Sequence, residues 1–156
     1  LYSTGIRRAE VINLLLTDVD YQDGLGRVNS GKGNKDRVVP IGKIACRYIE
    51  NYIKAIRPSL IRDPYNNHLF LSMKGSRLSK SVVGELVKRY GKKSKVKKNI
   101  TPHTLRRSFA THHIGQNTRL EFIQSMMGHK DIRTTRGYQY ITPAHLESVR
   151  SPHDFL

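Results

Sequence analysis

The chain has 156 residues, 37% of them hydrophobic, which suffices for one ordinary domain with a buried core and excludes disorder by composition. Lysine and arginine total 28 against 12 aspartate and glutamate residues, so the formal net charge of +16 favours an anionic partner, with nucleic acid as the leading candidate. The single cysteine, Cys46, excludes a disulfide framework and a zinc site with two or more cysteines, and no apolar run approaches the roughly 20 residues that span a bilayer.

The first third of the chain predicts a helix followed by a small sheet. Apolar residues over residues 7–16 follow the i, i+3, i+4 spacing of a helix that lies on a core. From Asp18 onward the pattern changes to short apolar runs separated by Gly-rich turns, the last run being residues 38–40. This change predicts a small antiparallel meander or hairpin.

The middle of the chain returns to helical spacing. Over residues 44–56, Ile49, Ile53 and Ile56 fall on one face, and Pro58 lies just beyond the expected end. Ser79 is a candidate cap for a further helix.

The helix expected after Ser79 has an apolar face that includes Tyr90, and it leads into a lysine-rich run over residues 88–98. Most charge runs are solvated loops, but the total charge of this chain favours a surface that contacts phosphates.

In the last third, Thr101 followed by Pro102 predicts a helix start, with the helix running to about His113. Thr142 and Pro143 repeat this arrangement and predict a final helix.

Between these two helices, Thr118 and Glu121 fit a capping box for a helix with Leu120, Ile123 and Met127 directed inward, and Gly128 fits its C-terminal end. Together the segments predict an α+β fold that is mainly α-helical, with a small antiparallel β-sheet near the N-terminal third.

Acidic residues are few and scattered along the sequence. A nuclease that uses two metal ions would therefore lack carboxylate ligands. A protein of this kind that cuts DNA needs a cationic clamp in place of the ions and a side-chain nucleophile in place of activated water, so we expect no metal and no other cofactor.

Residues suited to such a clamp are present. His103 and Arg106 lie three residues apart on a predicted helix and share one face, Arg7 begins another helix, and His129 follows a helix end. A planar guanidinium donates in bidentate fashion, so the two arginines suit the non-bridging oxygens of a phosphodiester. Lys32 lies in a Gly-rich turn.

Tyr138 follows Gly137 in a polar stretch and is the candidate nucleophile. Taken singly, each of these residues is more typical of a surface or packing role. Their combination and order make the pattern specific.

The pattern resembles the catalytic domain of the tyrosine recombinase family, the phage-integrase or Xer-like proteins. The matching stretches, which extend over essentially the whole chain, are residues 3–11, 31–37, 101–112, 127–131 and 134–138. Two departures are Arg107, where many relatives have histidine, and Tyr140, a second tyrosine close to Tyr138.

The resemblance implies a role for each candidate. Five residues would surround the scissile phosphate, namely Arg7, Lys32, His103, Arg106 and His129. Tyr138 would attack the phosphorus, and Lys32 would protonate the departing 5′ oxygen. Glu10 either pairs with a nearby arginine and orients it or forms an exposed ion pair of little consequence.

The resemblance further implies a site-specific DNA recombinase or integrase. Such an enzyme cleaves and rejoins strands of double-stranded DNA through a 3′-phosphotyrosyl intermediate, without metal or ATP, and exchanges strands as a homotetramer on DNA. We expect it to be cytoplasmic and nucleoid-associated, with no membrane partner. Residues 1–156 would then be a fragment of the catalytic domain that lacks the N-terminal DNA-clamping domain and the first catalytic-domain helices.

Two alternatives remain open at this point. A type IB topoisomerase-like enzyme would use the same cleavage chemistry to relax supercoiled DNA. A basic DNA-binding module without catalytic activity would share the charge but not the chemistry.

Overall fold

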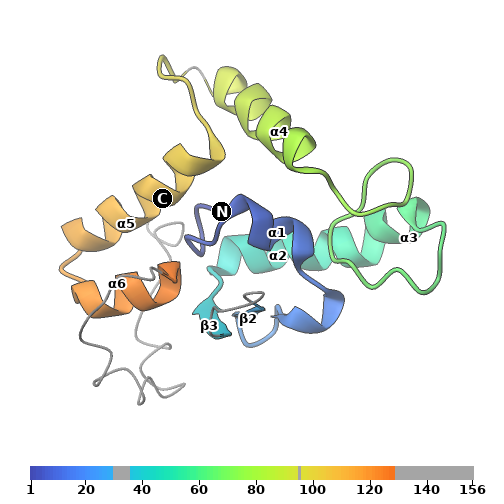
Figure 1. Cartoon of the computed structure of the whole chain (residues 1–156), viewed down its shortest axis with the longest axis horizontal. Helices are drawn as coiled ribbons and strands as arrows, with labels where there is room; N and C mark the ends of the chain where they lie inside the picture. The colour runs from blue at the N-terminus through green and yellow to red at the C-terminus, as the bar shows by residue number, and fades with distance from the viewer. Residues whose placement is uncertain (30–35, 95, 129–156) are drawn as a thin grey trace.

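The computed structural model describes residues 1–29, 36–94 and 96–128. In chain order the elements are α1 (Arg8–Asn13), the 3₁₀ turn η1 (Leu16–Asp18), β1 (Val19–Asp20), β2 (Leu25–Val28), β3 (Arg37–Pro40), α2 (Lys43–Asn51), the π-helical turn η2 (Tyr52–Ile56), α3 (Arg57–Leu60), α4 (Lys80–Lys93), α5 (Pro102–Gly115) and α6 (Leu120–Met127). Figure 1 shows α5 and α6 on one side of the molecule and the rod formed by α2, η2 and α3 on the other. The predicted α+β fold, mainly helical with a small sheet in the N-terminal third, is confirmed.

The sheet is an antiparallel meander in the order β1–β2–β3. Val28 at the end of β2 pairs with Arg37 at the start of β3, so the hairpin brings the Arg37 backbone beside the end of β2. Val28 and Val39 are buried, because alternate residues of a strand point to the same face. The described sheet thus presents one apolar face to the core.

The helix predicted over residues 7–16 ends early, at Asn13. The Leu14 carbonyl accepts a hydrogen bond from the Leu69 amide at 2.8 Å, and the Leu16 amide donates to the Asn67 carbonyl at 2.9 Å. Pairing with a distant segment therefore replaces the last helical turn, and local spacing does not reveal such pairing.

The helix predicted over residues 44–56 does not end before Pro58. It continues through the π-helical turn η2 into α3, and Pro58 lies inside α3. In a regular α-helix, a proline clashes with the carbonyl group four residues earlier. The π-helical turn η2 precedes Pro58 and changes the backbone there, so the helix continues past the proline. The wider turn also shifts the apolar face, so Ile56 is exposed rather than directed inward.

The cap predicted at Ser79 is confirmed, since its Oγ accepts a hydrogen bond from the Val82 amide at 3.3 Å. Tyr90, predicted to face inward, is exposed because the end of α4 extends away from the core (Figure 1). Its ring instead lies 5.5 Å from the Arg89 guanidinium and 5.7 Å from the Lys93 ammonium.

The Thr101 cap is also confirmed, because its Oγ1 accepts a hydrogen bond from the Thr104 amide at 3.1 Å. The capping box predicted at Thr118 is wrong. Arg119 occupies the N-cap position of α6 without a side-chain capping hydrogen bond, and the Thr118 Oγ1 instead lies 3.1 Å from Nδ1 of His113.

Leu120, predicted to face inward, is exposed, whereas Ile123 and Met127 are buried as expected. Gly128 ends α6 in the left-handed conformation, with φ of 62°, as predicted. The final helix predicted after Thr142 lies outside the described residues.

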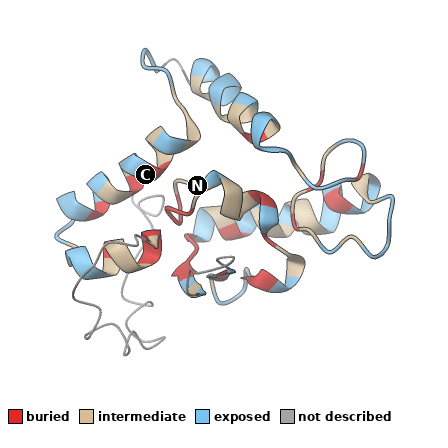
Figure 2. Ribbon diagram, in the orientation of Figure 1, coloured by how far each residue is buried: buried red, intermediate tan, exposed pale blue. Residues whose placement is uncertain are grey.

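The core fixes the N-terminal segment against α5. Phe109 is fully buried, and a Cβ added to Gly5, whose φ is +63°, would lie 2.5 Å from the Phe109 ring. Figure 2 shows buried residues gathered where the N-terminal segment, the end of α6 and the sheet meet. Within the described ranges, none of the helices is long and apolar enough to cross a lipid bilayer.

Candidate active site

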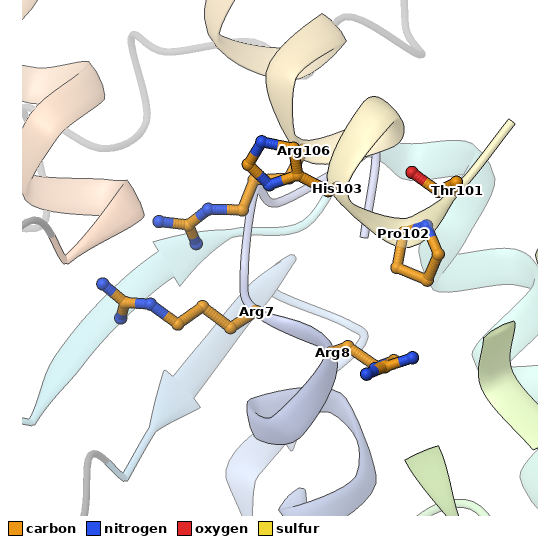
Figure 3. Close-up of a pocket in the computed structure, with 6 residues that line it drawn as sticks. All are labelled: Arg7, Arg8, Thr101, Pro102, His103 and Arg106. Carbon is orange, nitrogen blue, oxygen red and sulfur yellow. The ribbon is translucent and has the colours of Figure 1, made fainter. Parts of the chain in front are cut away.

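A cavity of about 490 Å³ opens between the start of α1 and the start of α5 (Figure 3). Its lining consists of cationic and neutral residues, namely Arg7, Arg8, Thr101, Pro102, His103 and Arg106. Among the described residues, the lining contains three arginines and a histidine but no carboxylate, so the cavity suits an anion. Three predicted site residues therefore come together here from segments almost a hundred residues apart.

The other three predicted site residues, Lys32, His129 and Tyr138, lie outside the described residues, as does Tyr140. His103 is exposed on the first turn of α5, one turn before Arg106. Arg107 is exposed on α5 and is not among the residues that line the cavity.

Arg106 is rigidly held. Only 7% of the residue is exposed, its Nη1 donates to the Gly5 carbonyl at 2.6 Å, and its Nη2 donates to the Met127 carbonyl at 2.7 Å. Burial, reinforced by the charges of Arg7 and Arg37, lowers the pKa of Arg106 to about 10. The guanidinium is still charged at neutral pH, and its remaining N–H donors are available to an anion.

Arg7, the residue that precedes α1, is held by two acceptors and remains partly open to the cavity. Its Nη1 donates to Glu10 at 3.0 Å, its Nη2 donates to the Gly128 carbonyl, and 37% of its side chain is exposed. Its backbone amide donates to the other Glu10 oxygen at 2.6 Å. Glu10 thus orients Arg7, as one of the two sequence interpretations expected.

Arg37 was assigned no role in the sequence analysis, yet it joins the same network. Its Nη2 donates to Glu10 at 2.8 Å, its Nη1 donates to the same carboxylate at 3.1 Å, and its Nε donates to the Met126 carbonyl at 2.7 Å. The only local signal was an arginine at the head of an apolar strand. No spacing rule links it to a glutamate 27 residues earlier.

Glu10 is the carboxylate that holds Arg7 and Arg37 together, and only 10% of its side chain is exposed. Burial raises the pKa of this carboxyl group. The hydrogen bonds from Arg37 and from the Arg7 backbone, together with the Arg37 charge, lower the pKa by more than burial raises it. The net pKa is therefore below the ordinary value, and the carboxylate is ionised at neutral pH.

Three successive carbonyl groups at the end of α6 each accept a hydrogen bond from a different arginine. Met126 accepts from Arg37, Met127 from Arg106 and Gly128 from Arg7. The last carbonyl groups of a helix lack partners within the helix and carry partial negative charge, so cations stabilise them. The end of α6 thereby fixes the relative positions of the three guanidinium groups.

Gly128 is required for this arrangement. A Cβ at this position would lie 2.8 Å from Nη1 of Arg37, and the positive φ already disfavours other residues. His129 directly follows this glycine in the sequence. Among the described residues, no cluster of three or more His, Cys, Asp or Glu side chains is arranged to hold a metal ion.

The chain matches the model of the Phage integrase family over residues 1–145. It is 41% identical to the tyrosine recombinase XerD of Staphylococcus epidermidis over 149 residues, which are 96% of this chain and 50% of that protein. It is 40% identical over the same length to the tyrosine recombinase XerD of Staphylococcus saprophyticus. The chain thus spans about half the length of the curated relatives it matches.

Solved structures agree with this result. The structure is similar to that of the XerA recombinase with a TM-score of 0.77 and 34% identity, covering 94% of this chain and 52% of the other. The XerH site-specific recombinase bound to its difH substrate gives a TM-score of 0.69 and 28% identity, covering 94% of this chain and 42% of the other. The lambda integrase catalytic core, at 22% identity and a TM-score of 0.61 over 85% of this chain and 77% of the other, shares the fold.

Proposed function

The chain belongs to the phage integrase family, and on this basis we propose that it is the catalytic part of a site-specific DNA recombinase. The enzyme cleaves and rejoins strands of double-stranded DNA through a 3′-phosphotyrosyl intermediate and needs neither metal nor ATP. One observation carries the proposal: Arg7 and Arg106, from separate segments, line one cavity in which the described residues include no carboxylate.

Arg7 and Arg106 hold the two non-bridging oxygens of the scissile phosphate. Backbone carbonyls and Glu10 use some of their N–H donors and fix both guanidinium planes before DNA arrives. Donors fixed in advance stabilise the charge that develops in the transition state without further reorganisation. His103, at the mouth of the same cavity, assists as a hydrogen-bond donor or proton acceptor.

Tyr138 attacks the phosphorus. A free tyrosine has a pKa of ~10 and is mostly protonated at neutral pH. The concentrated positive charge around Tyr138 favours its phenolate form. His129 donates to a phosphoryl oxygen. Lys32 protonates the departing 5′ oxygen, a general-acid role that contributes roughly 10²–10⁴-fold to the rate. The bond energy is kept in the phosphotyrosyl link, so a 5′-hydroxyl of another strand reverses the step.

The proposal is tested by trapping the intermediate on a nicked duplex. Wild-type protein should become covalently attached to DNA, and Tyr138→Phe should form no adduct while it still binds. Arg106→Lys, which keeps the charge, should bind DNA but lose most of the adduct, because a lysine cannot hold two acceptors and an anion in one plane. Binding by the wild-type, full-length protein without any adduct would favour a DNA-binding module.

Assays of the same protein on two kinds of DNA also distinguish a recombinase from an enzyme that relaxes supercoils. A recombinase should join two duplexes that carry its site. Efficient relaxation of supercoiled plasmid with no joined product would instead indicate the activity of a type IB topoisomerase.

We further propose that an N-terminal DNA-clamping domain works with this chain and that four protomers assemble on DNA. The first point is supported by the relatives, which are about twice as long as this chain. Sedimentation of the full-length protein with two site-bearing duplexes should give a homotetramer, and a strictly monomeric complex would contradict it. Such a protein acts at the nucleoid, in the cytoplasm.

A further inference from the structure

Arg8 lines the same cavity as Arg7 and Arg106 but extends to its other side. Consecutive residues at the start of a helix point in different directions. Figure 3 shows the Arg7 side chain extending toward the Arg106 guanidinium, whereas the Arg8 side chain extends the other way, to a position below Pro102 in this view. The cavity therefore has guanidinium groups on two sides rather than on one.

Arg8 differs from the neighbouring arginines in what it holds. Arg7, Arg37 and Arg106 each donate to a carbonyl group at the end of α6. Within residues 1–29, 36–94 and 96–128, no carboxylate or carbonyl group accepts a hydrogen bond from the Arg8 guanidinium, and the residue is exposed. Its charge therefore contributes little to holding the described fold together.

The position of the Arg8 guanidinium is nevertheless restricted. Its Nη1 lies against α4 at Gly84, where an added Cβ would be 3.4 Å away. Glycine inside a helix costs about 1 kcal/mol relative to alanine, and here it leaves room for the arginine. The Arg8 side chain is thus kept at the cavity, and no carboxylate of the described residues neutralises it.

The size and charge of the cavity fit more than one phosphate. Its volume of about 490 Å³ falls within the range of sites that enclose whole organic ligands, roughly 300–1,000 Å³. Successive nucleotides of one strand advance by about 3.4 Å along the duplex axis. A strand whose scissile phosphate lies between Arg7 and Arg106 therefore brings its neighbouring phosphate close to the same cavity.

We propose that Arg8 binds the phosphodiester adjacent to the scissile one in the cleaved strand and fixes the register of that strand. The inference rests on the proposed function, because it places the scissile phosphate on Arg7 and Arg106. Arg8 is then a positioning residue: it contributes to the affinity for DNA and leaves the chemistry of cleavage to the other side of the cavity.

The test combines single charge changes in the protein and in the DNA. The cleavage position is first mapped with the wild-type, full-length protein by the adduct assay. Duplexes are then made with one neutral methylphosphonate at each phosphate around that position, on either strand, and the dissociation constants of wild type and Arg8→Ala are measured.

Arg8→Ala should weaken binding to the unmodified duplex about tenfold. At the adjacent phosphate of the cleaved strand, the methylphosphonate should weaken wild-type binding about tenfold but Arg8→Ala binding by less than about twofold. At every other phosphate, the fold-changes in dissociation constant caused by Arg8→Ala and by the methylphosphonate should multiply.

Two variants serve as controls. Arg47→Ala removes the same charge from an exposed position on α2 that does not line the cavity, and it should couple to none of these phosphates. Arg8→Lys keeps the charge and should retain most of the affinity. The thermal unfolding of Arg8→Ala should match that of the wild type.

Effects that multiply at every position, or that couple at the scissile phosphate or on the opposite strand, would overturn the assignment of Arg8. Adduct formation without coupling contradicts the Arg8 inference alone. Failure of the wild type to form an adduct contradicts the proposed function, and the inference falls with it.

Discussion

The side chains of the site have unequal roles, although most carry the same charge. Arg106 is buried and held by two carbonyl groups, Arg7 is partly exposed, and Arg8 is exposed at the other side of the cavity. Rigid groups suit transition-state stabilisation, because their orientation is fixed before DNA binds. An exposed arginine that no carboxylate of the described residues neutralises suits the binding of a phosphate.

Glu10 is the residue whose removal should most directly disturb this arrangement. Glu10→Gln leaves the nearly buried Arg37 and the partly exposed Arg7 without their carboxylate. We expect it to lower the free energy of unfolding by about 3 kcal/mol at pH 7, measured by urea denaturation. The folded-state pKa of Glu10 is lowered, so its contribution is present above the unfolded pKa and is lost as pH falls through the folded pKa. The difference between variant and wild type should therefore shrink in acid.

Glu50→Gln is the matched control, because its ion pair with Lys54 is exposed. We expect a change of about 0.5 kcal/mol or less. Equal losses from the two substitutions would contradict the role given to Glu10.

His113 makes a second pH dependence testable. Its ring is buried, and its Nε2 has no hydrogen-bond partner within the part of the chain that the structure describes. Burial, followed by the charge of His112, lowers its pKa from the ordinary 6.5. A group with a depressed folded-state pKa contributes stability above its unfolded pKa and loses it as pH falls. Wild-type stability should therefore decline between pH 7 and pH 5, and His113→Gln should decline less over this interval. Parallel curves for the two proteins would show that His113 does not contribute.

At the scale of elements, the end of α6 organises the site. Gly128→Ala places a methyl group 2.8 Å from Nη1 of Arg37 and adds a side chain at a positive φ. We expect about 1–2 kcal/mol of destabilisation from the backbone alone and a lower cleavage rate on a nicked duplex, with most DNA affinity retained.

Gly115→Ala is the control, because a Cβ at Gly115 would meet no atom of residues 1–29, 36–94 or 96–128 within 4 Å. It should leave cleavage unchanged and stability equal or slightly higher. A similar loss of cleavage in both variants would contradict the proposal that the end of α6 organises the site.

The predictions of helix ends are confirmed where the residues at the end themselves determine the local structure. Ser79 and Thr101 cap their helices through their own hydroxyl groups, and Gly128 ends α6 in the conformation that glycine favours. The predictions are wrong where contacts with a segment distant in sequence determine the local structure. The chain leaves α1 to pair with residues 67–69, and Thr118 contacts His113 instead of capping α6.

The same distinction applies to the site. Arg7, His103 and Arg106 belong to stretches whose residue types and order identify the family, so the sequence alone was enough to select them. Arg37 and Arg8 were not selected. Arg37 acts through a bidentate contact with Glu10 that only folding creates, and Arg8 lines the cavity because α1 starts beside α5.

At the scale of the molecule, the net charge of +16 should dominate binding to DNA. The logarithm of the binding constant should fall linearly with the logarithm of salt concentration, because phosphate contacts release counterions. For roughly 6–10 contacts we expect a loss of about 10³–10⁵-fold between roughly 50 and 200 mM salt, measured by fluorescence anisotropy. Affinity that hardly changes with salt would contradict binding through the phosphate backbone.

We expect a cage of arginines to gather around one phosphate and Tyr138 to attack it. The most direct measurement is to identify both ends of the covalent link after reaction with a nicked duplex, by peptide mass spectrometry and by labelling of the DNA ends. We expect Tyr138 to be joined to a 3′-phosphate, with a free 5′-hydroxyl on the released strand. A link through Tyr140 or another residue, or a link to a 5′-phosphate, would contradict it.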